Sequence, residues 1–371
     1  MKIILFANTP WYLFNFCFPL ADAVRQTGCE ILLVSPEGEF ADRLKAAGFR
    51  HFPFPIQRRS LNPVTEWRTL NRLVHLYRRE KPDIVHHFTT KCIIYGSQAA
   101  HTVGVRHVVN SVTGMGYAFS GNQISRRFLR VIIKQLYRRT LVGTSVLFQN
   151  PNDRSEFIKE KLVSSDQTTL IRSSGVNLDR FKVFPEPNGT PLVVLVGRML
   201  YDKGIVEFVK ASRLLRDRNV VARFVLVGEP DSQNPASIPL RKLKSWDKEG
   251  TIEWWGWQED MVQVYRQAHI VCLPSYREGV PKTLIEAAAS GRPIVTTDSP
   301  GCREVVQHGI NGLLVPVHSV RELADAIHVL IEDKKLRQQM GLEGRRVAEG
   351  DFKLQNVLAA ILAVYGIDQN K

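Results

Sequence analysis

Short apolar runs alternate with longer amphipathic stretches along almost the whole chain, and this alternation constrains the fold more than any other feature of the sequence. In the first half, residues 2–7 and 30–34 predict strands, while residues 63–80 predict a helix. The second half repeats the alternation from residue 192 onward. Strands that alternate with helices form parallel sheets covered by helices on both faces. The sequence therefore predicts an α/β protein with two doubly wound, Rossmann-like domains.

The same periodicity predicts the individual elements and the division of the chain. Strands are predicted at 2–7, 30–34, 51–54, 83–86, 107–111, 145–148, 169–171, 192–196, 223–227, 251–254, 270–273, 294–297 and 312–315. Helices in the first half are predicted at 15–27, 40–47, 63–80, 93–103, 123–140 and 151–161. Residues 183–191 are rich in turn formers and predict a linker. We expect an N-terminal domain at 1–185, a C-terminal domain at 186–352, and a last helix at 353–371 that packs back on the first domain.

Composition narrows the class of protein. The chain has 371 residues, of which 44% are hydrophobic and 23% charged, as in ordinary globular proteins. Its five cysteines show no CxxC pair or metal-binding spacing, so we interpret them as reduced thiols of a cytoplasmic protein. No apolar run approaches the ~18 residues that predict a membrane-spanning helix. The apolar start at residues 1–7 is interrupted at Asn8 and Pro10, and we interpret it as a core strand instead of a signal peptide.

Two glutamates, Glu278 and Glu286, lie in a segment that predicts a loop followed by a helix. Pro281 suits the first helical position, and Gly291 with Pro293 suits the end. Backbone N–H groups at 280–283 would then form an anion pocket at the positive end of the helix dipole. Carboxylate oxygens only accept hydrogen bonds, so the two glutamates suit sugar or ribose hydroxyls attached to a bound phosphate.

A second segment, from Gly197 to Gly204, follows the predicted strand at 192–196 and carries Arg198 and Lys203. A planar guanidinium and a mobile ammonium at the carboxyl end of a strand together suit a diphosphate. The alternative is a pair of solvated loop cations. The anion pocket predicted downstream favours the diphosphate.

These motifs, with Pro300-Gly-Cys-Arg-Glu304 and Asn311-Gly-Leu-Leu-Val-Pro316, resemble the retaining family 4 glycosyltransferases of GT-B architecture, over essentially the whole chain. The resemblance implies that Arg198 and Lys203 bind the donor diphosphate, that Glu278 contacts the donor sugar, and that Glu286 contacts the ribose. It also implies donor-binding roles for neighbouring positions. These are Gly197, Gly204, Gly279, Val280, Pro281, Lys282, Thr283, Leu284 and Trp257, the last beside the nucleotide base unless Trp254 to Trp257 form a core aromatic cluster.

Segments 58–63, 112–117 and 228–235, together with Lys91, resemble bacterial transferases that extend undecaprenyl-diphosphate-linked saccharides for N-glycans, O-antigen and capsule. The resemblance implies an acceptor or sugar side formed by Asn8, Asn15, Lys91, Thr113 and Gly114. Many family members have a histidine at the position of Thr113, which leaves the contacts to the sugar open.

Other residues of the first half have two possible roles. Trp11, Tyr12 and Phe14 lie in the first strand-to-helix connection, predicted as a loop without the family's paired glycines, and indicate an apolar acceptor edge. His86 and His87 end a predicted strand, so they suit either an acceptor contact or a structural role.

Positive charge gathers in the first half of the chain. Residues 1–190 hold 26 Lys and Arg against 14 Asp and Glu, while residues 191–371 hold 24 against 22. The predicted helix at 123–140 is basic and amphipathic, which favours an anionic membrane surface, although a core helix with solvated cations is the alternative. Its cations are Arg126, Arg127, Arg130, Lys134, Arg138 and Arg139. No nucleic-acid-binding motif is found, so nucleic acid is not an expected partner.

The expected function is transfer of a hexosyl or N-acetylhexosaminyl group from a UDP-sugar to a polyprenyl-diphosphate-linked saccharide, with retained configuration and with neither metal nor cofactor. The expected partners are the nucleotide sugar, the lipid-linked saccharide and the inner face of the cell membrane, with the protein peripherally attached. The alternatives are a nucleotide-sugar epimerase or hydrolase and a non-catalytic sugar-nucleotide-binding scaffold. The joint presence of Arg198, Lys203, Glu278 and Glu286 favours the transferase.

Overall fold

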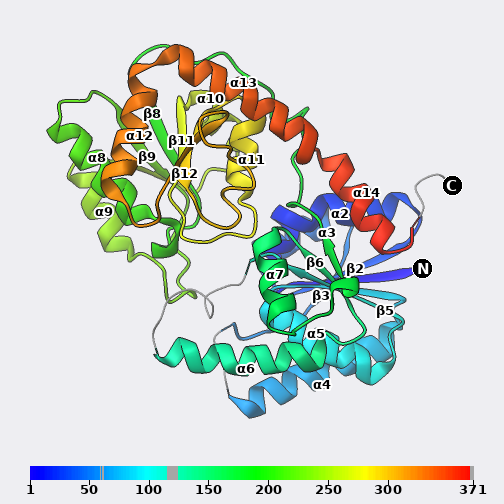
Figure 1. Cartoon of the computed structure of the whole chain (residues 1–371). Helices are drawn as coiled ribbons and strands as arrows, with labels where there is room; N and C mark the ends of the chain where they lie inside the picture. The colour runs from blue at the N-terminus through cyan, green and yellow to red at the C-terminus, as the bar shows by residue number, and fades with distance from the viewer. Residues whose placement is uncertain (59, 61, 115–123, 368–371) are drawn as a thin grey trace. The chain divides into compact units, whose positions relative to one another are not determined.

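The computed structural model describes residues 1–58, 60, 62–114 and 124–367, except for the side chains of residues 124–126. The chain divides into two compact units: the N-terminal unit runs from blue to green in Figure 1 and includes the red C-terminal segment, and the C-terminal unit runs from green to orange. The N-terminal unit comprises Met1–Ser174 and Gln355–Lys371, and the C-terminal unit comprises Gly175–Leu354. Each unit has its own parallel sheet and its own buried core.

The division between the units follows Ser174, ahead of the expected position at residue 185. Val176 and Phe181 are buried in the core of the C-terminal unit, and the Val176 N–H donates to the Phe352 carbonyl at 2.8 Å. At the other end, Leu362 and Tyr365 are buried in the core of the N-terminal unit. Burial of these few apolar side chains decides to which unit each connecting segment belongs.

The N-terminal unit is a seven-stranded sheet in the order β3-β2-β1-β4-β5-β6-β7, with every pair of neighbours parallel. Its strands are β1 (Lys2–Phe6), β2 (Glu30–Ser35), β3 (Arg50–Pro53), β4 (Ile84–Phe88), β5 (His107–Val112), β6 (Ser145–Phe148) and β7 (Thr168–Leu170). Its helices are α1 (Pro10–Tyr12), α2 (Phe18–Gln26), α3 (Glu39–Ala46), α4 (Pro63–Glu80), α5 (Thr90–Val103), α6 (Ile124–Thr140), α7 (Pro151–Lys159) and α14 (Leu354–Val364).

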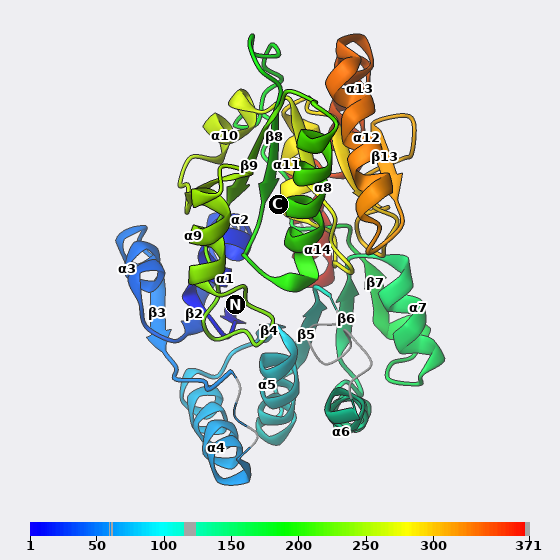
Figure 2. The same cartoon turned by 90° about the vertical axis from the view of Figure 1, so that its left-hand side faces the viewer.

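Alternate residues of each strand pack on opposite faces of this sheet. Ile3 and Leu5 belong to the core beneath α2 and α14, whereas Ile4 and Phe6 belong to the core beneath α4 and α5. Figure 2 shows α4, α5 and α6 in a row on one side of the sheet. Because both faces are covered, β1 and β2 are apolar over most of their length, as expected of a doubly wound fold.

The C-terminal unit is a six-stranded parallel sheet in the order β10-β9-β8-β11-β12-β13. Its strands are β8 (Leu192–Val196), β9 (Arg223–Val227), β10 (Glu253–Gly256), β11 (Ile270–Leu273), β12 (Ile294–Thr297) and β13 (Gly312–Val315). Its helices are α8 (Ile205–Asp217), α9 (Leu240–Lys248), α10 (Met261–Gln267), α11 (Lys282–Ala289), α12 (Val320–Glu332) and α13 (Lys334–Asp351). Both units therefore confirm the predicted α/β class.

The first connection is the largest error in the predicted elements. Residues 8–15 were expected to form a loop, yet α1 begins at Pro10 and continues through a π-helical segment (Leu13–Cys17) into α2. The Thr9 hydroxyl accepts the Tyr12 N–H at 3.2 Å, and Pro10 occupies the first turn. A capping threonine followed by proline is typical of a helix start. The prediction treated Pro10 only as the end of the strand and therefore placed the helix start too late.

Candidate active site

The loop that carries Arg198 and Lys203 leaves the carboxyl end of β8 and leads into α8. A short 3₁₀ turn at Tyr201–Lys203 precedes Gly204, which lies at the start of α8 with φ of 72°. A Cβ atom on Gly204 would lie 2.1 Å from the Pro274 carbonyl oxygen. Glycine is therefore required on two counts, and it brings this loop against the segment that follows β11.

Lys203 and Glu278 form an ion pair between these two loops. The Lys203 Nζ lies 2.5 Å from Glu278 Oε1, and the Ser275 hydroxyl donates to the same oxygen at 2.6 Å. Both side chains are mostly buried, with 19% and 14% of the side chain exposed. A charge-assisted contact at this depth holds the ammonium and the carboxylate in one geometry.

Arg198 is tied to a third loop, which follows β9. Its Nη1 lies 2.9 Å from Asp231 Oδ2, while the Asp231 Oδ1 accepts the Gln233 N–H. The Arg198 side chain remains 44% exposed. Arg198 and Lys203, predicted as a pair of diphosphate ligands, are each held by a carboxylate from a different loop.

The helix that follows Glu278 begins one residue later than predicted. Pro281 is the N-cap residue, with extended φ and ψ, and α11 starts at Lys282. The Leu284 and Ile285 N–H groups both donate to the Pro281 carbonyl. Gly279, Val280, Lys282 and Thr283 thus form the entry to α11, at the positive end of the helix dipole as expected.

The loop before α11 is packed tightly against a neighbouring turn. The Glu278 N–H donates to the Pro300 carbonyl at 3.1 Å, and Gly301 has φ of 83°. A Cβ atom on Gly301 would lie 2.2 Å from the Gly279 carbonyl oxygen. The glycine in the Pro300–Glu304 motif thereby lets this turn support the backbone next to Glu278.

Glu286 lies one turn further along α11 and is only 6% exposed. The Tyr265 hydroxyl donates to its Oε2 at 3.1 Å, and Lys282 Nζ lies 3.7 Å from its Oε1. Burial raises the pKa of Glu286, because a charge in a poorly solvated place is costly, and the nearby Lys282 ammonium only partly offsets this.

Trp257 follows β10, and its side chain is 46% exposed. Its backbone N–H donates to Glu229 Oε1 at 3.2 Å. Trp254 is placed differently, with its indole N–H donating to the Gly228 carbonyl at 2.8 Å and its side chain packed against the core. The tryptophans therefore divide between core packing and an exposed indole at the loop.

Sequence reasoning missed three residues that hold the predicted ones in place: Asp231, Ser275 and Tyr265. Asp231 and Ser275 lie inside motifs that were singled out, but their partners lie 33 and 3 residues away along the chain. Tyr265 belongs to α10 and is fully buried. The hydroxyl of a buried tyrosine needs a hydrogen-bond partner. A tyrosine within a predicted core helix is therefore the signal that could have indicated a polar partner such as Glu286.

Three of the predicted acceptor residues, Asn8, Thr113 and Gly114, follow the carboxyl ends of β1 and β5 in the N-terminal unit. Asn8 follows β1, and the Asn15 side-chain amide donates to the Trp11 carbonyl within the helix at 2.9 Å. Thr113 and Gly114 follow β5, and the Tyr12 hydroxyl lies 3.4 Å from the Thr113 hydroxyl. Residues 115–117 of the segment 112–117 lie outside the described part of the chain, as do Arg59 and Leu61 of the segment 58–63.

Lys91 holds a loop of its own unit. Its ammonium donates to the Gln57 carbonyl at 2.8 Å, to the Ser60 carbonyl at 2.6 Å and to the Glu66 carboxylate at 2.7 Å. An ammonium has three N–H donors, and these contacts use all three. In this state Lys91 stabilises the segment between β3 and α4.

His86 and His87 are inside β4, which extends to Phe88 beyond the predicted end at residue 86. Burial lowers the pKa of both side chains, that of His87 to about 4, so both are neutral. His87 Nδ1 lies 2.9 Å from Asn110 Oδ1, and its Nε2 lies 3.0 Å from the Tyr77 hydroxyl. His86 points to the opposite face, where its partners are Tyr365 and Ser111.

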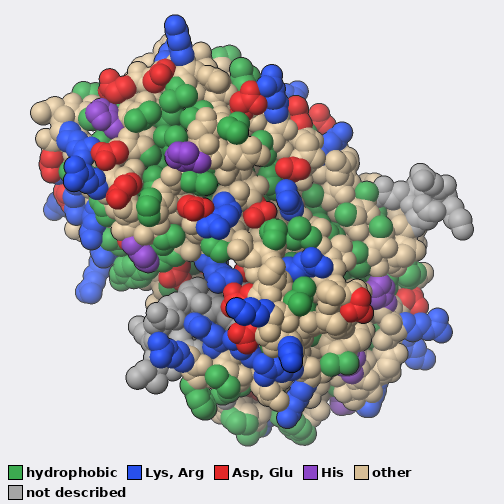
Figure 3. Space-filling model, viewed as in Figure 1, with side chains coloured by type: hydrophobic (Ala, Val, Ile, Leu, Met, Phe, Trp, Pro, Cys, Tyr) green, Lys and Arg blue, Asp and Glu red, His purple; other side chains and the backbone are tan. Residues whose placement is uncertain are grey.

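Helix α6, which holds the basic segment, packs one side into the core and exposes large apolar side chains on the other. Its side chains Leu129, Ile133, Leu136 and Tyr137 pack into the core. On its other side Phe128 is 71% and Val131 65% exposed. Figure 3 shows basic and apolar side chains side by side over this helix.

The cations of α6 differ in their surroundings. Arg127, Arg138 and Arg139 are exposed, whereas Lys134 is half-buried and lies 3.1 Å from Glu160 Oε2. Arg138 also donates to the Glu160 carbonyl at 3.0 Å. The side chain of Arg126 lies outside the described part of the structure. Two of the six cations thus fasten α6 to the end of α7.

Among the described residues, no helix is both long and apolar enough to cross a membrane. Within the same part of the chain, no group of three or more His, Cys, Asp or Glu side chains is arranged to hold a metal ion.

Known proteins match both halves of the chain. Residues 177–347 match the family described as glycosyl transferases group 1, and residues 2–150 match the family described as glycosyl transferase 4-like. The N,N'-diacetylbacillosaminyl-diphospho-undecaprenol alpha-1,3-N-acetylgalactosaminyltransferase of Campylobacter jejuni is 26% identical over 351 residues, covering 91% of each chain. The UDP-Gal:alpha-D-GlcNAc-diphosphoundecaprenol alpha-1,3-galactosyltransferase of Escherichia coli is 24% identical, covering 82% of this chain and 80% of its own.

Solved structures show the same architecture. Anabaena HepE in complex with UDP and glucose superposes with a TM-score of 0.79 at 18% identity, covering 99% of each chain. With domains of both families and with the two doubly wound units of a GT-B fold, the chain belongs to the group 1 and family 4-like glycosyltransferases.

Proposed function

We propose that the protein is a retaining glycosyltransferase that moves a hexosyl or N-acetylhexosaminyl group from a UDP-sugar to a polyprenyl-diphosphate-linked saccharide. The observation that carries the proposal is the Lys203–Glu278 pair, held at 2.5 Å beside the entry to α11. The lysine ammonium of this pair suits a phosphate, and the glutamate carboxylate suits sugar hydroxyls. Both lie beyond the carboxyl ends of β8 and β11. The two relatives, whose names specify lipid-diphosphate-linked acceptors, support the choice of acceptor.

In this proposal the donor diphosphate binds Arg198, Lys203 and the N-terminal end of α11. In the ligand-free protein Arg198 pairs with Asp231 and Lys203 pairs with Glu278. When the donor binds, phosphate oxygens replace these carboxylates as partners of the two cations. Glu278 then accepts from hydroxyls of the donor sugar, and Glu286 accepts from the ribose. The half-exposed Trp257 indole lies against the uracil ring.

The proposed reaction breaks the bond between the anomeric carbon and the diphosphate oxygen and forms a bond from that carbon to an acceptor hydroxyl on the same face. The proton of the hydroxyl passes to the departing phosphate oxygen, so the products are UDP and the extended lipid. Glycosyl transfer develops positive charge on the sugar ring and negative charge on the leaving group. Arg198 and Lys203 stabilise that negative charge, and the proposed reaction needs neither a metal ion nor a cofactor.

The proposed location is the inner face of the cell membrane, with peripheral attachment. The exposed Phe128 and Val131 side chains on α6, next to exposed arginines, support a surface that inserts between anionic headgroups. A lipid-linked acceptor would be reached from that surface.

The test is transfer from a panel of UDP-hexoses and UDP-N-acetylhexosamines to an extract of lipid-diphosphate-linked saccharides. The expected result is one extended lipid, by product mass, with the anomeric configuration of the donor. Release of free sugar would favour a hydrolase, and an altered nucleotide sugar would favour an epimerase. Tight binding of a UDP-sugar without any product across acceptors would favour a non-catalytic scaffold.

A further inference from the structure

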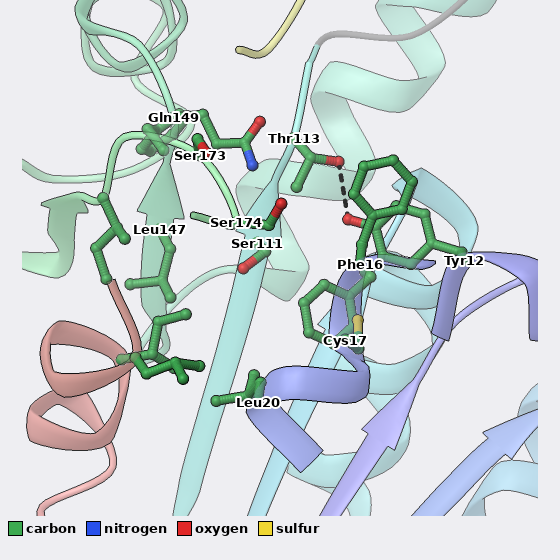
Figure 4. Close-up of a pocket in the computed structure, with 15 residues that line it drawn as sticks. Tyr12, Phe16, Cys17, Leu20, Ser111, Thr113, Leu147, Gln149, Ser173 and Ser174 are labelled. Carbon is green, nitrogen blue, oxygen red and sulfur yellow. Dashed lines mark hydrogen bonds between the residues drawn. The ribbon is translucent and has the colours of Figure 1, made fainter. Parts of the chain in front are cut away.

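A pocket lies in the N-terminal unit where β4, β5 and β6 end (Figure 4). One of its walls is aromatic and aliphatic and includes Tyr12, Phe16 and Leu20 from the first helical segment. The lining also includes polar side chains, among them Ser111, Thr113 and Gln149. None of the residues that line this pocket in the described structure is charged. The pocket therefore suits a small neutral group with one polar and one apolar side.

The size of the pocket limits what enters it. Its free volume is about 40 Å³. One water molecule needs roughly 10–15 Å³ of such volume, so the pocket admits about three or four heavy atoms. A whole sugar ring is too large, and a phosphate would meet no cation. A lone hydroxyl would leave the aromatic and aliphatic wall without contact, which costs dispersion energy.

The Ser111 hydroxyl is oriented by a buried chain of hydrogen bonds that runs from Tyr365 through His86. The Tyr365 hydroxyl lies 2.5 Å from His86 Nδ1, and His86 Nε2 lies 2.7 Å from the Ser111 hydroxyl. His86 is fully buried, and Tyr365 is 3% exposed. Among the described residues, the Tyr365 hydroxyl has no other hydrogen-bond partner. It must therefore donate to Nδ1.

The donor and acceptor roles in the two hydrogen bonds from Tyr365 through His86 to Ser111 follow from the chemistry of neutral imidazole. Burial lowers the pKa of His86 and raises that of Tyr365, so both side chains keep their neutral forms. A neutral imidazole has one acceptor nitrogen and one donor nitrogen. Since Nδ1 accepts from Tyr365, Nε2 carries the proton and donates to Ser111. The hydroxyl proton of Ser111 is then available to a ligand in the pocket.

We propose that this pocket receives the acetamido group of the acceptor saccharide, with the Ser111 hydroxyl donating to its carbonyl oxygen and the aromatic and aliphatic wall contacting its methyl group. The inference rests on the proposed function, because it names a feature of the acceptor of that reaction. An acetamido group has four heavy atoms, a carbonyl acceptor and an apolar methyl, and so matches the size of the pocket and its mixed lining of apolar and neutral polar side chains. His86 and Tyr365 act as positioning residues, since they touch Ser111 and not the ligand.

The chain offers a matched control for the buried relay. On the opposite face of β4, the Tyr77 hydroxyl lies 3.0 Å from His87 Nε2, and Tyr77 is likewise fully buried. Tyr77 and His87 do not line the pocket. Tyr77→Phe and Tyr365→Phe thus each remove one buried hydrogen bond between a phenol and an imidazole. Only the imidazole that Tyr365 contacts is also hydrogen-bonded to Ser111.

The experiment measures equilibrium binding of two short-chain prenyl-diphosphate probes, one carrying N-acetylglucosamine and one carrying glucose, by titration calorimetry with UDP present. We expect the wild-type protein to bind the acetamido probe about tenfold more tightly, in line with one buried hydrogen bond and a buried methyl. Ser111→Ala should reduce the preference to about twofold or less. Tyr365→Phe should reduce it in the same direction, and Tyr77→Phe should leave it unchanged.

Equal affinity of the wild-type protein for the two probes would overturn the inference, and so would a full preference in folded Ser111→Ala. If Ser111→Ala does not fold, Tyr365→Phe decides by the same comparison. A transfer assay on the two probes separates this inference from the proposed function. Equal binding with transfer to both retains the function and removes the pocket assignment. Preferential binding without transfer to either retains the pocket and removes the function.

Discussion

The Lys203 ammonium and the Glu278 carboxylate lie 2.5 Å apart, although 75 residues separate them along the chain. Lys203 precedes α8, and Glu278 precedes α11, so the contact joins the loops after two neighbouring strands, β8 and β11. Ser275 adds a second donor to the same carboxylate oxygen. In the ligand-free protein the pair thus gives both charged side chains a partner, and a bound diphosphate would replace the carboxylate as the partner of Lys203.

Lys203→Ala should lower kcat/KM for sugar transfer by about 100-fold or more, because one preorganised cation at the leaving diphosphate is lost. The measurement is initial rates of UDP release with a lipid-linked acceptor. The control is Arg213→Ala, which removes an exposed cation paired with Glu249 at 2.6 Å on the same unit. Near-normal turnover of folded Lys203→Ala would contradict the diphosphate assignment.

The pH dependence of donor binding should report Glu286. Its pKa is raised in the folded protein, so its carboxylate protonates at a higher pH than an ordinary glutamate as the solution is acidified. A protonated carboxyl accepts fewer hydrogen bonds from ribose, and UDP affinity should therefore fall as pH drops through that raised pKa. Calorimetric titration with UDP between about pH 4 and 8 measures this, given the usual glutamate pKa of about 4.3.

Glu286→Gln should bind UDP more weakly at neutral pH and should lose the acid-side decline, because the amide does not titrate. The exposed Glu332, on α12, supplies the control variant Glu332→Gln. An acid-side decline that persists unchanged in Glu286→Gln would assign the titration to another group.

Gly204→Ala should destabilise the C-terminal unit and reduce transfer together. The added Cβ would lie 2.1 Å from the Pro274 carbonyl oxygen, at a φ of 72°. Gly250 has nearly the same φ, 73°, with no atom within 4 Å of the corresponding position. Gly250→Ala therefore adds only the strain of the left-handed backbone, of order 1 kcal/mol of folding free energy, without the steric clash of Gly204→Ala.

The melting temperature of Gly204→Ala should accordingly fall further than that of Gly250→Ala, with activity lost only in the first. Equal stability of the two variants would mean that the Gly204 and Pro274 segments do not pack this closely in solution.

Membrane attachment should depend on the exposed apolar side of α6. The double variant Phe128→Ser/Val131→Ser removes two side chains that are 71% and 65% exposed. We expect its partition onto vesicles rich in phosphatidylglycerol to fall by at least about tenfold, because each buried apolar side chain contributes about 1.5–3 kcal/mol. Co-sedimentation with vesicles at fixed salt measures the partition.

Val221 and Leu342 provide the control, since they are 74% and 57% exposed on the other unit. Val221→Ser/Leu342→Ser should leave the partition unchanged. A wild-type protein that binds neutral and anionic vesicles equally weakly would remove α6 as a membrane-binding surface.

Most strands could be predicted because their signal is local. The runs at 192–196, 223–227, 270–273, 294–297 and 312–315 are each found as strands with those bounds. A strand covered on both faces needs a continuous apolar run, which is visible in the sequence. The predicted bounds failed where polar or aromatic residues blur the period. β4 includes two histidines, and the first helix starts at Pro10 within an aromatic segment.

The sequence by itself determined which types of side chain form the candidate site and that they follow the ends of strands. Glycine and proline mark the turns that carry these side chains, and the local backbone geometry of such turns follows from residue type. It could not show which carboxylate holds which cation. Asp231 with Arg198 and Glu278 with Lys203 are pairs between loops, and strand order decides which loops are neighbours.

Only the tertiary structure decided how the two histidines are used. Their places in the sequence are adjacent, and successive residues of a strand point to opposite faces. His87 therefore forms a hydrogen bond with Tyr77, which lies 10 residues away on α4. His86 forms one with Tyr365, which lies 279 residues away near the C-terminal end of the chain. A contact over such a separation depends on how the whole N-terminal unit packs, because no local propensity of either segment favours it.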